Sequence, residues 1–101
     1  MAGKTIRWSI RAQQDRLQIL VYWINRNKSN TYAKKLYLLF NSAIDLISSH
    51  PEIGKPTNKE NVKIKVVKDY LVIYQIQPES IDILTIWDSR QDPKNIERFI
   101  G

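Results

Sequence analysis

Apolar and polar residues alternate along the last third of the chain. β-Branched and aromatic residues dominate three short runs, at residues 62–67, 70–77 and 81–87. Lys68 and Asp69 separate the first two runs, and the turn-forming segment 78–80 separates the second two. Strand-forming residues bounded by turn residues predict an antiparallel meander.

The first quarter of the chain predicts a strand followed by a helix. Thr5–Trp8 alternates and is short, which is typical of an edge strand. Ser9 is a good N-cap for a helix that ends near residues 25–28. Within this helix, apolar residues recur at i, i+3, i+4 and i+7, which predicts one buried stripe. The residues of this stripe are Leu17, Leu20, Val21 and Ile24.

A second helix is predicted from a cap at Ser29 or Asn30 to about Ser49. Pro51 ends it, because the residue before a proline disfavours the helical conformation. Only a short polar segment separates the two apolar stripes, so we expect an antiparallel helical hairpin. The second stripe consists of Ala33, Leu36, Phe40, Ala43, Ile44 and Ile47.

The remaining segments complete an α+β order. Residues 50–56 form a loop with fixed turns before the meander, and residues 94–100 can form a short last helix with Asn95 or Asp92 near its start. The order strand, helix, helix, meander, short helix predicts a single domain over residues 1–101. We expect the antiparallel helical hairpin to pack on one face of an antiparallel sheet.

The first meander strand has two different faces. Period two separates its apolar residues from its lysines. The apolar residues are Val62, Ile64 and Val66, and the lysines are Lys63 and Lys65. We expect the apolar set to face the helices, in one core with Ile83 and one face of residues 70–77. The lysines would then form either a solvated face that discourages aggregation or a cationic patch for phosphate or an acidic peptide.

Composition limits the class of protein. With 101 residues, 43% of them hydrophobic and 26% charged, the chain can bury one modest core and is not of the disordered type. The apolar runs are too short for a membrane span, and the first residues lack the apolar stretch of a signal peptide. The absence of cysteine excludes disulfides and thiolate metal sites and fits a cytoplasmic protein.

The charge is unevenly distributed. The net charge is +6, and the first fifty residues carry eight Lys and Arg against two Asp and Glu, whereas the second half is balanced. A basic surface favours nucleic acid or an acidic partner. Lysine and arginine on exposed helix faces also simply keep a protein soluble.

Few residues suggest chemistry. Tyr74 could stack on a base or donate a proton, or it could be a core residue with its hydroxyl at the rim. Arg90 stands between Asp88 and Asp92, so it could form a structural ion pair or present its planar fork to a phosphate or carboxylate. His50 is the sole histidine, and no glycine-rich nucleotide loop occurs. We therefore expect no metal and no cofactor.

Four segments, in this order and spacing, resemble a known family. They are IRWSIRAQQDRLQILVYW, ISSHPEIGKP, VKIKVVKDYLVIYQI and IDILTIWDSRQDP. They are similar to the opening strand and helix, the loop before the sheet, the paired strands and the closing arginine motif of the RelE/ParE superfamily of bacterial type II toxin–antitoxin toxins.

The resemblance implies a small growth-inhibiting toxin, of the kind associated with plasmid stabilisation, that is neutralised by an antitoxin encoded beside it. Antitoxins of this superfamily wrap an extended segment and a helix around the toxin, which corresponds to β-augmentation and helix-in-groove recognition. RelE-like members cleave mRNA on the ribosome, whereas ParE-like members poison DNA gyrase. An acidic antitoxin would suit the basic half of this chain.

The resemblance favours the ParE side. Metal-free RNA cleavage needs a base, an acid and cations for the developing charge. In that case Lys65, Tyr74 and Arg90 would match the basic, aromatic and closing arginine positions, but the tail NIERFIG offers no tyrosine or histidine. We therefore expect a gyrase poison that binds its partner or target through Lys63, Lys65 and Arg90. The alternatives are a ribosome-dependent endoribonuclease and a degenerate antitoxin-binding module without toxicity.

Overall fold

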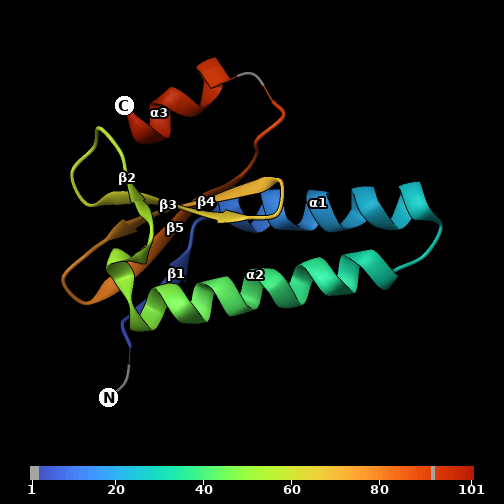
Figure 1. Ribbon diagram of the computed structural model, residues 1–101, viewed down its shortest axis with the longest axis horizontal. Coiled ribbons are helices and arrows are strands. Elements are labelled where there is room, and N and C mark those ends of the chain that lie inside the picture. Colours follow the sequence, from blue (N-terminus) through green and yellow to red (C-terminus); the bar gives the residue numbers. More distant parts are fainter. Residues whose placement is uncertain (1–2, 92) are drawn as a thin grey trace.

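The computed structural model describes residues 3–91 and 93–101, and it has three layers. A mixed five-stranded sheet lies between a helical hairpin on one face and the C-terminal segment on the other (Figure 1). The helices are α1 (Ile10–Asn27), α2 (Thr31–Ser49) and α3 (Glu97–Ile100), and 3-10 turns form at η1 (Pro51–Ile53) and η2 (Pro93–Ile96). The strands are β1 (Thr5–Trp8), β2 (Lys55–Pro56), β3 (Val62–Val67), β4 (Tyr70–Ile76) and β5 (Ser80–Asp88).

The strand order is β1-β5-β4-β3-β2. Strands β3, β4 and β5 form the predicted antiparallel meander, and β1 is the predicted edge strand. Strand β1 runs parallel to β5, with Thr5 opposite Ser80, so the sheet is mixed rather than wholly antiparallel. The α+β class, the N-terminal strand and the hairpin are confirmed.

Ser9 joins the first helix to the sheet. Its hydroxyl oxygen accepts a hydrogen bond from the Ala12 N–H at 2.9 Å, which caps α1, and its O–H donates to the Leu84 carbonyl at 2.9 Å. Leu84 lies where the register between β4 and β5 shifts, so this bulge offers a carbonyl to the helix cap. The predicted N-cap is therefore confirmed.

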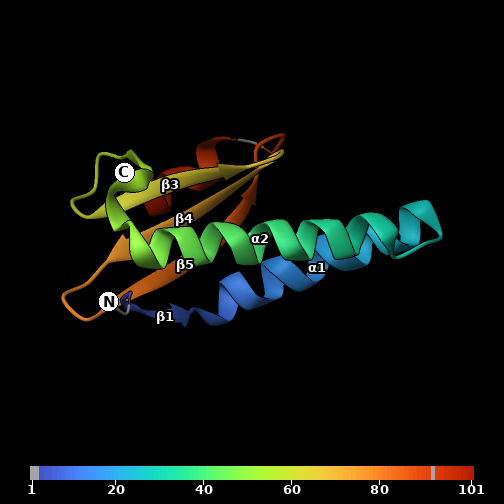
Figure 2. The same ribbon diagram turned by 60° about the horizontal axis from the view of Figure 1, so that its bottom comes forward.

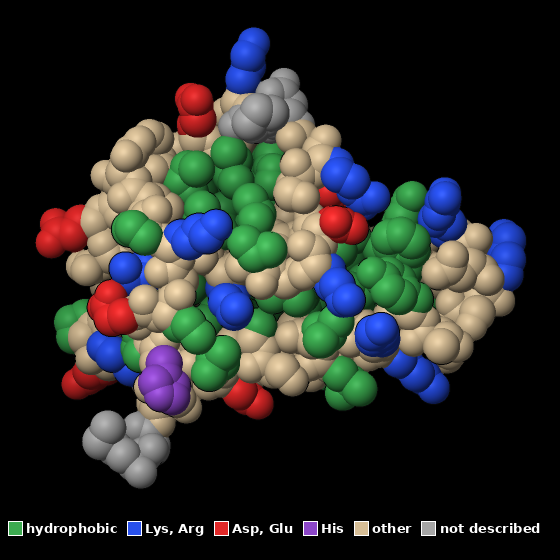
Figure 3. Space-filling model, in the orientation of Figure 1, with side chains coloured by type: hydrophobic (Ala, Val, Ile, Leu, Met, Phe, Trp, Pro, Cys, Tyr) green, Lys and Arg blue, Asp and Glu red, His purple; other side chains and the backbone are tan. Residues whose placement is uncertain are grey.

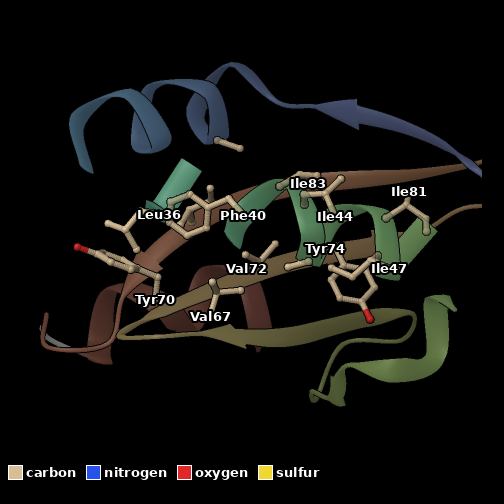
Figure 4. Close-up of a cluster of buried hydrophobic side chains, with 13 residues drawn as sticks. Leu36, Phe40, Ile44, Ile47, Val67, Tyr70, Val72, Tyr74, Ile81 and Ile83 are labelled. Carbon is tan, nitrogen blue, oxygen red and sulfur yellow. The ribbon is translucent and has the colours of Figure 1, made fainter. Parts of the chain in front are cut away.

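The buried stripe of α2 is confirmed, because all six residues predicted for it are buried. Figure 4 shows Leu36, Phe40, Ile44 and Ile47 among them, pointing into the core. The stripe of α1 is wrong. Leu17 is 62% exposed, and Val21 and Ile24 are also exposed, whereas Leu20 is half-buried. The residues of α1 that pack against the core lie on a neighbouring face of the helix: Ala12, Ile19, Leu20 and Trp23.

The prediction for the faces of β3 is also wrong. Lys63 and Lys65 stand opposite Tyr74 and Val72, which belong to the cluster that α2 covers. Cross-strand partners share a face of a sheet, so both lysines lie on the hairpin side.

The apolar residues of β3 lie on the other face of the sheet. Val62 and Ile64 join a second cluster under the C-terminal segment, while Val66 is 46% exposed. Ile83 lies in the first cluster, as predicted. The sheet therefore separates two hydrophobic clusters instead of covering a single one.

The connecting segments contain more structure than predicted. Residues 50–56, expected as a loop, form η1 and the short strand β2. The last helix is α3, preceded by the 3-10 turn η2, and its N-cap residue Ile96 makes no side-chain capping bond. Asn95 lies within η2, and Asp92 lies outside the described residues.

Candidate functional site

A cleft of about 420 Å³ lies between α1 and the end of β5. Both helix and strand contribute charged and aromatic side chains to it. Its lining residues include Arg11, Asp15, Tyr70, Trp87, Asp88 and Arg90. The positive charges of its two arginines equal the negative charges of its two aspartates, so the cleft is polar without an excess of either charge.

Arg90 is held by Asp88 at one side of this cleft. Its Nε and Nη2 donate to the two carboxylate oxygens of Asp88, at 2.9 Å each, and its backbone N–H donates to Oδ1 at 2.9 Å. These hydrogen bonds keep the pKa of the Asp88 carboxyl below its usual range and raise the pKa of Arg90. The structural ion pair considered for Arg90 therefore forms, and 53% of the Arg90 side chain remains exposed.

Asp15 fastens α1 to the bulged part of β5. Its Oδ2 accepts hydrogen bonds from the Thr85 hydroxyl and, at 3.3 Å, from the Ile86 N–H. Arg11 Nε lies 3.6 Å from the same oxygen and is buried without a hydrogen-bond partner. The Arg11 guanidinium also lies 5.2 Å from the centre of the Phe99 ring, so it links α1 to α3.

Tyr70 forms the inner wall of the cleft. Its hydroxyl oxygen accepts a hydrogen bond from Trp23 Nε1 at 2.7 Å. Burial raises the pKa of Tyr70, so this phenol stays neutral at physiological pH. The sequence interpretation missed Arg11, Asp15 and Tyr70 as cleft residues. The available signal was the i, i+4 spacing of Arg11 and Asp15 on one helix face.

A second hollow, a groove of about 320 Å³, lies between α2 and the outer edge of β3. Strand β2 pairs only with Lys63 and Ile64, so within the described residues the backbone of 65–67 has no strand partner on this side. The groove is lined by Leu39, Ser42, Ala43, Leu46, Lys65, Val66, Val67 and Lys68. It combines an open strand edge, an apolar floor and two lysines.

The two predicted lysines have different surroundings. Lys63 Nζ lies 3.2 Å from Glu52 Oε2, and only 16% of its side chain is exposed. Lys65 borders the groove beside β3. Lys65 is therefore the more available of the two for a partner.

Tyr74 is a core residue. It is fully buried, its O–H donates to the Pro51 carbonyl at 2.7 Å, and its oxygen accepts from the Gly54 N–H at 3.0 Å. Burial raises its pKa. A Cβ at residue 54 would lie 2.5 Å from this hydroxyl, so the close approach requires Gly54.

The three candidates for ribonuclease chemistry are not brought together. Tyr74 and Tyr70 are roughly 13 Å apart along β4, at about 3.3 Å per residue. Figure 4 shows their hydroxyls pointing away from one another. Arg90 follows Asp88, which pairs with Tyr70, whereas Tyr74 pairs with Lys63 at the other end of the strand. Lys65, Tyr74 and Arg90 therefore do not converge on a common point.

Residues 3–91 and 93–101 contain no group of three or more His, Asp or Glu side chains that could hold a metal ion. No helix in this part of the chain has the length and apolar character needed to cross a membrane.

Comparisons with known proteins agree with this architecture. The chain resembles a chain of the solved chromosomal ParDE toxin–antitoxin system from P. aeruginosa, with a TM-score of 0.70 and 14% identity, over 85% of this chain and 96% of that one. At this identity the similarity shows a shared fold. A comparison with curated proteins finds no match. The family model described as the ParE toxin of the type II toxin–antitoxin system parDE matches residues 6–93, so the chain belongs to the ParE toxin family.

Proposed function

We propose that this ParE-family toxin acts in the cytoplasm by binding DNA gyrase, and that a cognate acidic antitoxin neutralises it. The observation that carries the choice of gyrase over mRNA is the dispersal of the groups that RNA cleavage would need. A general acid or base must reach the reacting atoms within hydrogen-bond distance. Tyr74 is fully buried with its hydroxyl bonded to Pro51 and Gly54, and it faces away from the Arg90 end of β4.

A gyrase poison needs a binding surface rather than a set of convergent catalytic groups. The cleft at the end of β5 offers one, because it places the exposed guanidinium of Arg90 beside Trp87 and Tyr70. Arginine and aromatic side chains dominate the binding energy of many protein interfaces. Asp88 fixes the arginine in one orientation, which reduces the entropy lost on binding.

The groove beside β3 suits the antitoxin. An extended segment could pair with the open backbone of residues 65–67 and place an apolar side chain between α2 and the strand. Lys65 and Lys68 at its border would attract acidic residues that flank this side chain. Lys63 contributes less, because Glu52 already neutralises it.

Expression in cells tests the gyrase proposal. Induction of the wild-type chain should stop growth and lower plasmid supercoiling, while mRNA from the arrested cells shows no new cuts within reading frames. Arg90→Ala should weaken the arrest, and the matched change Arg98→Ala on α3 should not. New cuts at ribosome-bound codons with normal supercoiling would favour a ribonuclease, and no arrest at all would favour a degenerate antitoxin-binding module.

Association kinetics test the antitoxin site. Lys65→Glu should slow association with the purified antitoxin and flatten the salt dependence of the rate, because long-range attraction is screened by salt. Arg98→Glu makes the same charge change on the opposite face of the sheet, and we expect a much smaller effect. Equal effects of the two substitutions would show that the antitoxin responds only to overall charge.

A further inference from the structure

The helical hairpin carries most of the net positive charge of the chain. It extends well beyond the sheet, and the connection between α1 and α2 lies at its far end (Figure 2). Residues 16–44 contain five Lys and Arg and no Asp or Glu, so this span accounts for five of the six net positive charges. The Arg16 guanidinium lies 4.2 Å from the centre of the Trp8 ring, close to the sheet. The other four residues surround the free end of the hairpin: Arg26, Lys28, Lys34 and Lys35.

These four residues form an exposed cluster of like charge. Arg26 lies in the last turn of α1, and Lys34 and Lys35 lie within roughly 6 Å of the start of α2, at about 1.5 Å per helical residue. None of the four forms an ion pair with another of the described residues. Figure 3 shows Lys and Arg at the free end of the hairpin, without Asp or Glu beside them. Because like charges repel one another, an anionic partner would stabilise this cluster.

Lys28 stands where glycine is usual. Its φ of 54° is left-handed, and glycine or asparagine normally takes this conformation at the end of a helix. A lysine therefore costs stability here and places a charge at the tip of the hairpin. The rest of the connecting segment 25–31 consists of Asn, Arg, Ser and Thr. These are side chains that donate hydrogen bonds to phosphate oxygens in protein–DNA complexes.

We propose that the free end of the hairpin binds the phosphate backbone of duplex DNA without sequence preference. Two packed helices, each about 10–12 Å across with axes about 8–10 Å apart, are wider than the major groove of about 12 Å. The end of the hairpin therefore lies across the phosphates, where its Lys and Arg side chains replace counterions. The four basic residues line neither the cleft at β5 nor the groove beside β3, so the proposal is independent of the gyrase and antitoxin sites.

Other anionic partners fit this surface less well. Single-stranded RNA is recognised by stacking its bases on exposed aromatic rings. The aromatic residues nearest the free end, Tyr22, Trp23 and Tyr32, instead contact one another edge to face. Residues 25–31 include no apolar side chain that would insert into a lipid surface or form the apolar centre of a protein interface.

Fluorescence anisotropy with a labelled duplex of about 20 base pairs tests the proposal. We expect saturable binding by the purified toxin, with a Kd on the order of 10 µM at about 50 mM salt. A plot of log Kd against log salt should have a slope of about 3 to 4, which corresponds to about four phosphate contacts. The double substitution Arg26→Gln and Lys34→Gln should weaken binding about tenfold or more and lower this slope by about 2.

The matched control removes the same charges away from the hairpin. Lys55→Gln combined with Arg98→Gln changes two exposed residues of β2 and α3 and should weaken binding less than twofold. Equal effects of the two double variants would overturn the proposal, because binding would then respond only to overall charge. The absence of saturable binding by the folded wild-type toxin would also overturn it.

Lys28→Gly separates lost binding from lost folding. Glycine relieves the left-handed strain, so the variant should have a Tm higher by about 2–5 °C. It should nevertheless bind the duplex severalfold more weakly, because one phosphate contact is gone. A more stable variant that binds DNA as tightly as the wild type would contradict the role of Lys28.

Competition identifies the kind of anion. Unlabelled duplex of a different sequence should displace the probe as well as the same sequence does. Polyglutamate or single-stranded RNA of similar length should displace it poorly. If polyglutamate competes as well as the duplex, the surface binds an acidic protein, and if the RNA competes better, it binds RNA. Either result would overturn the assignment to duplex DNA.

Discussion

At the scale of single residues, Tyr74 connects β4 to the segment between α2 and β3. It is fully buried on the side of β4 that the helical hairpin covers. Its hydrogen-bond partners are the Pro51 carbonyl, 23 positions earlier, and the Gly54 N–H, 20 positions earlier. Both belong to a segment that the sequence predicts only as a loop. The buried phenol therefore fills the core and satisfies two backbone groups of the preceding segment.

Tyr74→Phe should destabilise the fold by about 1–3 kcal/mol, because the Gly54 N–H and the Pro51 carbonyl lose their partner. Burial raises the pKa of Tyr74 above its ordinary value of 10.0. Stability that depends on the neutral phenol is therefore complete below pH 10 and is lost as the pH rises through the pKa of the folded state.

Urea unfolding at neutral pH and above pH 10 measures both effects. The Tyr74→Phe variant should lose less stability than the wild type between these two conditions. The matched change Tyr22→Phe removes an exposed hydroxyl and should be neutral in both. An unchanged alkaline slope in Tyr74→Phe would mean that another group, such as Tyr70, dominates the titration.

At the scale of elements, periodicity identified the helices and strands but not always the side that faces the core. Helix α2 has one apolar side, and its predicted stripe is buried. Helix α1 has two apolar sides, and the more regular of these, which contains Leu17 and Ile24, is exposed. A stripe shows that a helix is amphipathic, but neighbouring elements decide which of two stripes meets the sheet.

In strand β3, too, alternation identifies the two faces but does not decide which of them meets the helices. Alternation separates its lysines from its apolar residues, but the prediction that the apolar residues face the helices supposes that only one face of the sheet is covered. Ile96 and Phe99 of the C-terminal segment pack on the second face. The apolar residues of β3 turn toward them, and Lys63 and Lys65 lie at the margin of the hairpin side, where β3 meets solvent.

Phe40→Ala tests the cluster under the hairpin. Phe40 is fully buried, and its ring centre lies 5.8 Å from that of Tyr70. The cavity should cost about 3–5 kcal/mol in the free energy of unfolding, measured with denaturant. Leu38→Ala, on the exposed side of the same helix, should change it by less than about 0.5 kcal/mol. Similar losses in the two variants would contradict the assigned face of α2.

Ile96→Ala tests the second cluster. Ile96 is buried with Val62, Ile73 and Trp87. We expect a loss near the lower end of about 2–5 kcal/mol, because a terminal segment can relax around the cavity. Trp87 fluorescence should report the change, and Asn95→Ala, an exposed position in the same turn, serves as the control. If Ile96→Ala is neutral, the C-terminal segment does not stabilise this face in solution.

At the scale of the whole molecule, the order of elements predicts the α+β fold, and the four segments that resemble the RelE/ParE superfamily predict its relationship to ParE toxins. The positions of the surfaces were not predictable, because each is built from segments far apart in sequence. Arg11 and Arg90, which are far apart in sequence, both line the cleft at β5. Leu46 and Lys65 both line the groove beside β3. A single domain over residues 1–101 stays a prediction.

Supercoiling by purified gyrase measures the proposed action of the toxin on its target. Relaxed plasmid, ATP and gyrase are incubated with increasing amounts of the toxin, and the supercoiled product is measured on a gel. We predict that wild-type toxin suppresses the supercoiled product in a dose-dependent way, that Arg90→Ala requires more protein for the same effect, and that added antitoxin restores supercoiling. Full supercoiling activity in a large excess of folded toxin would contradict it.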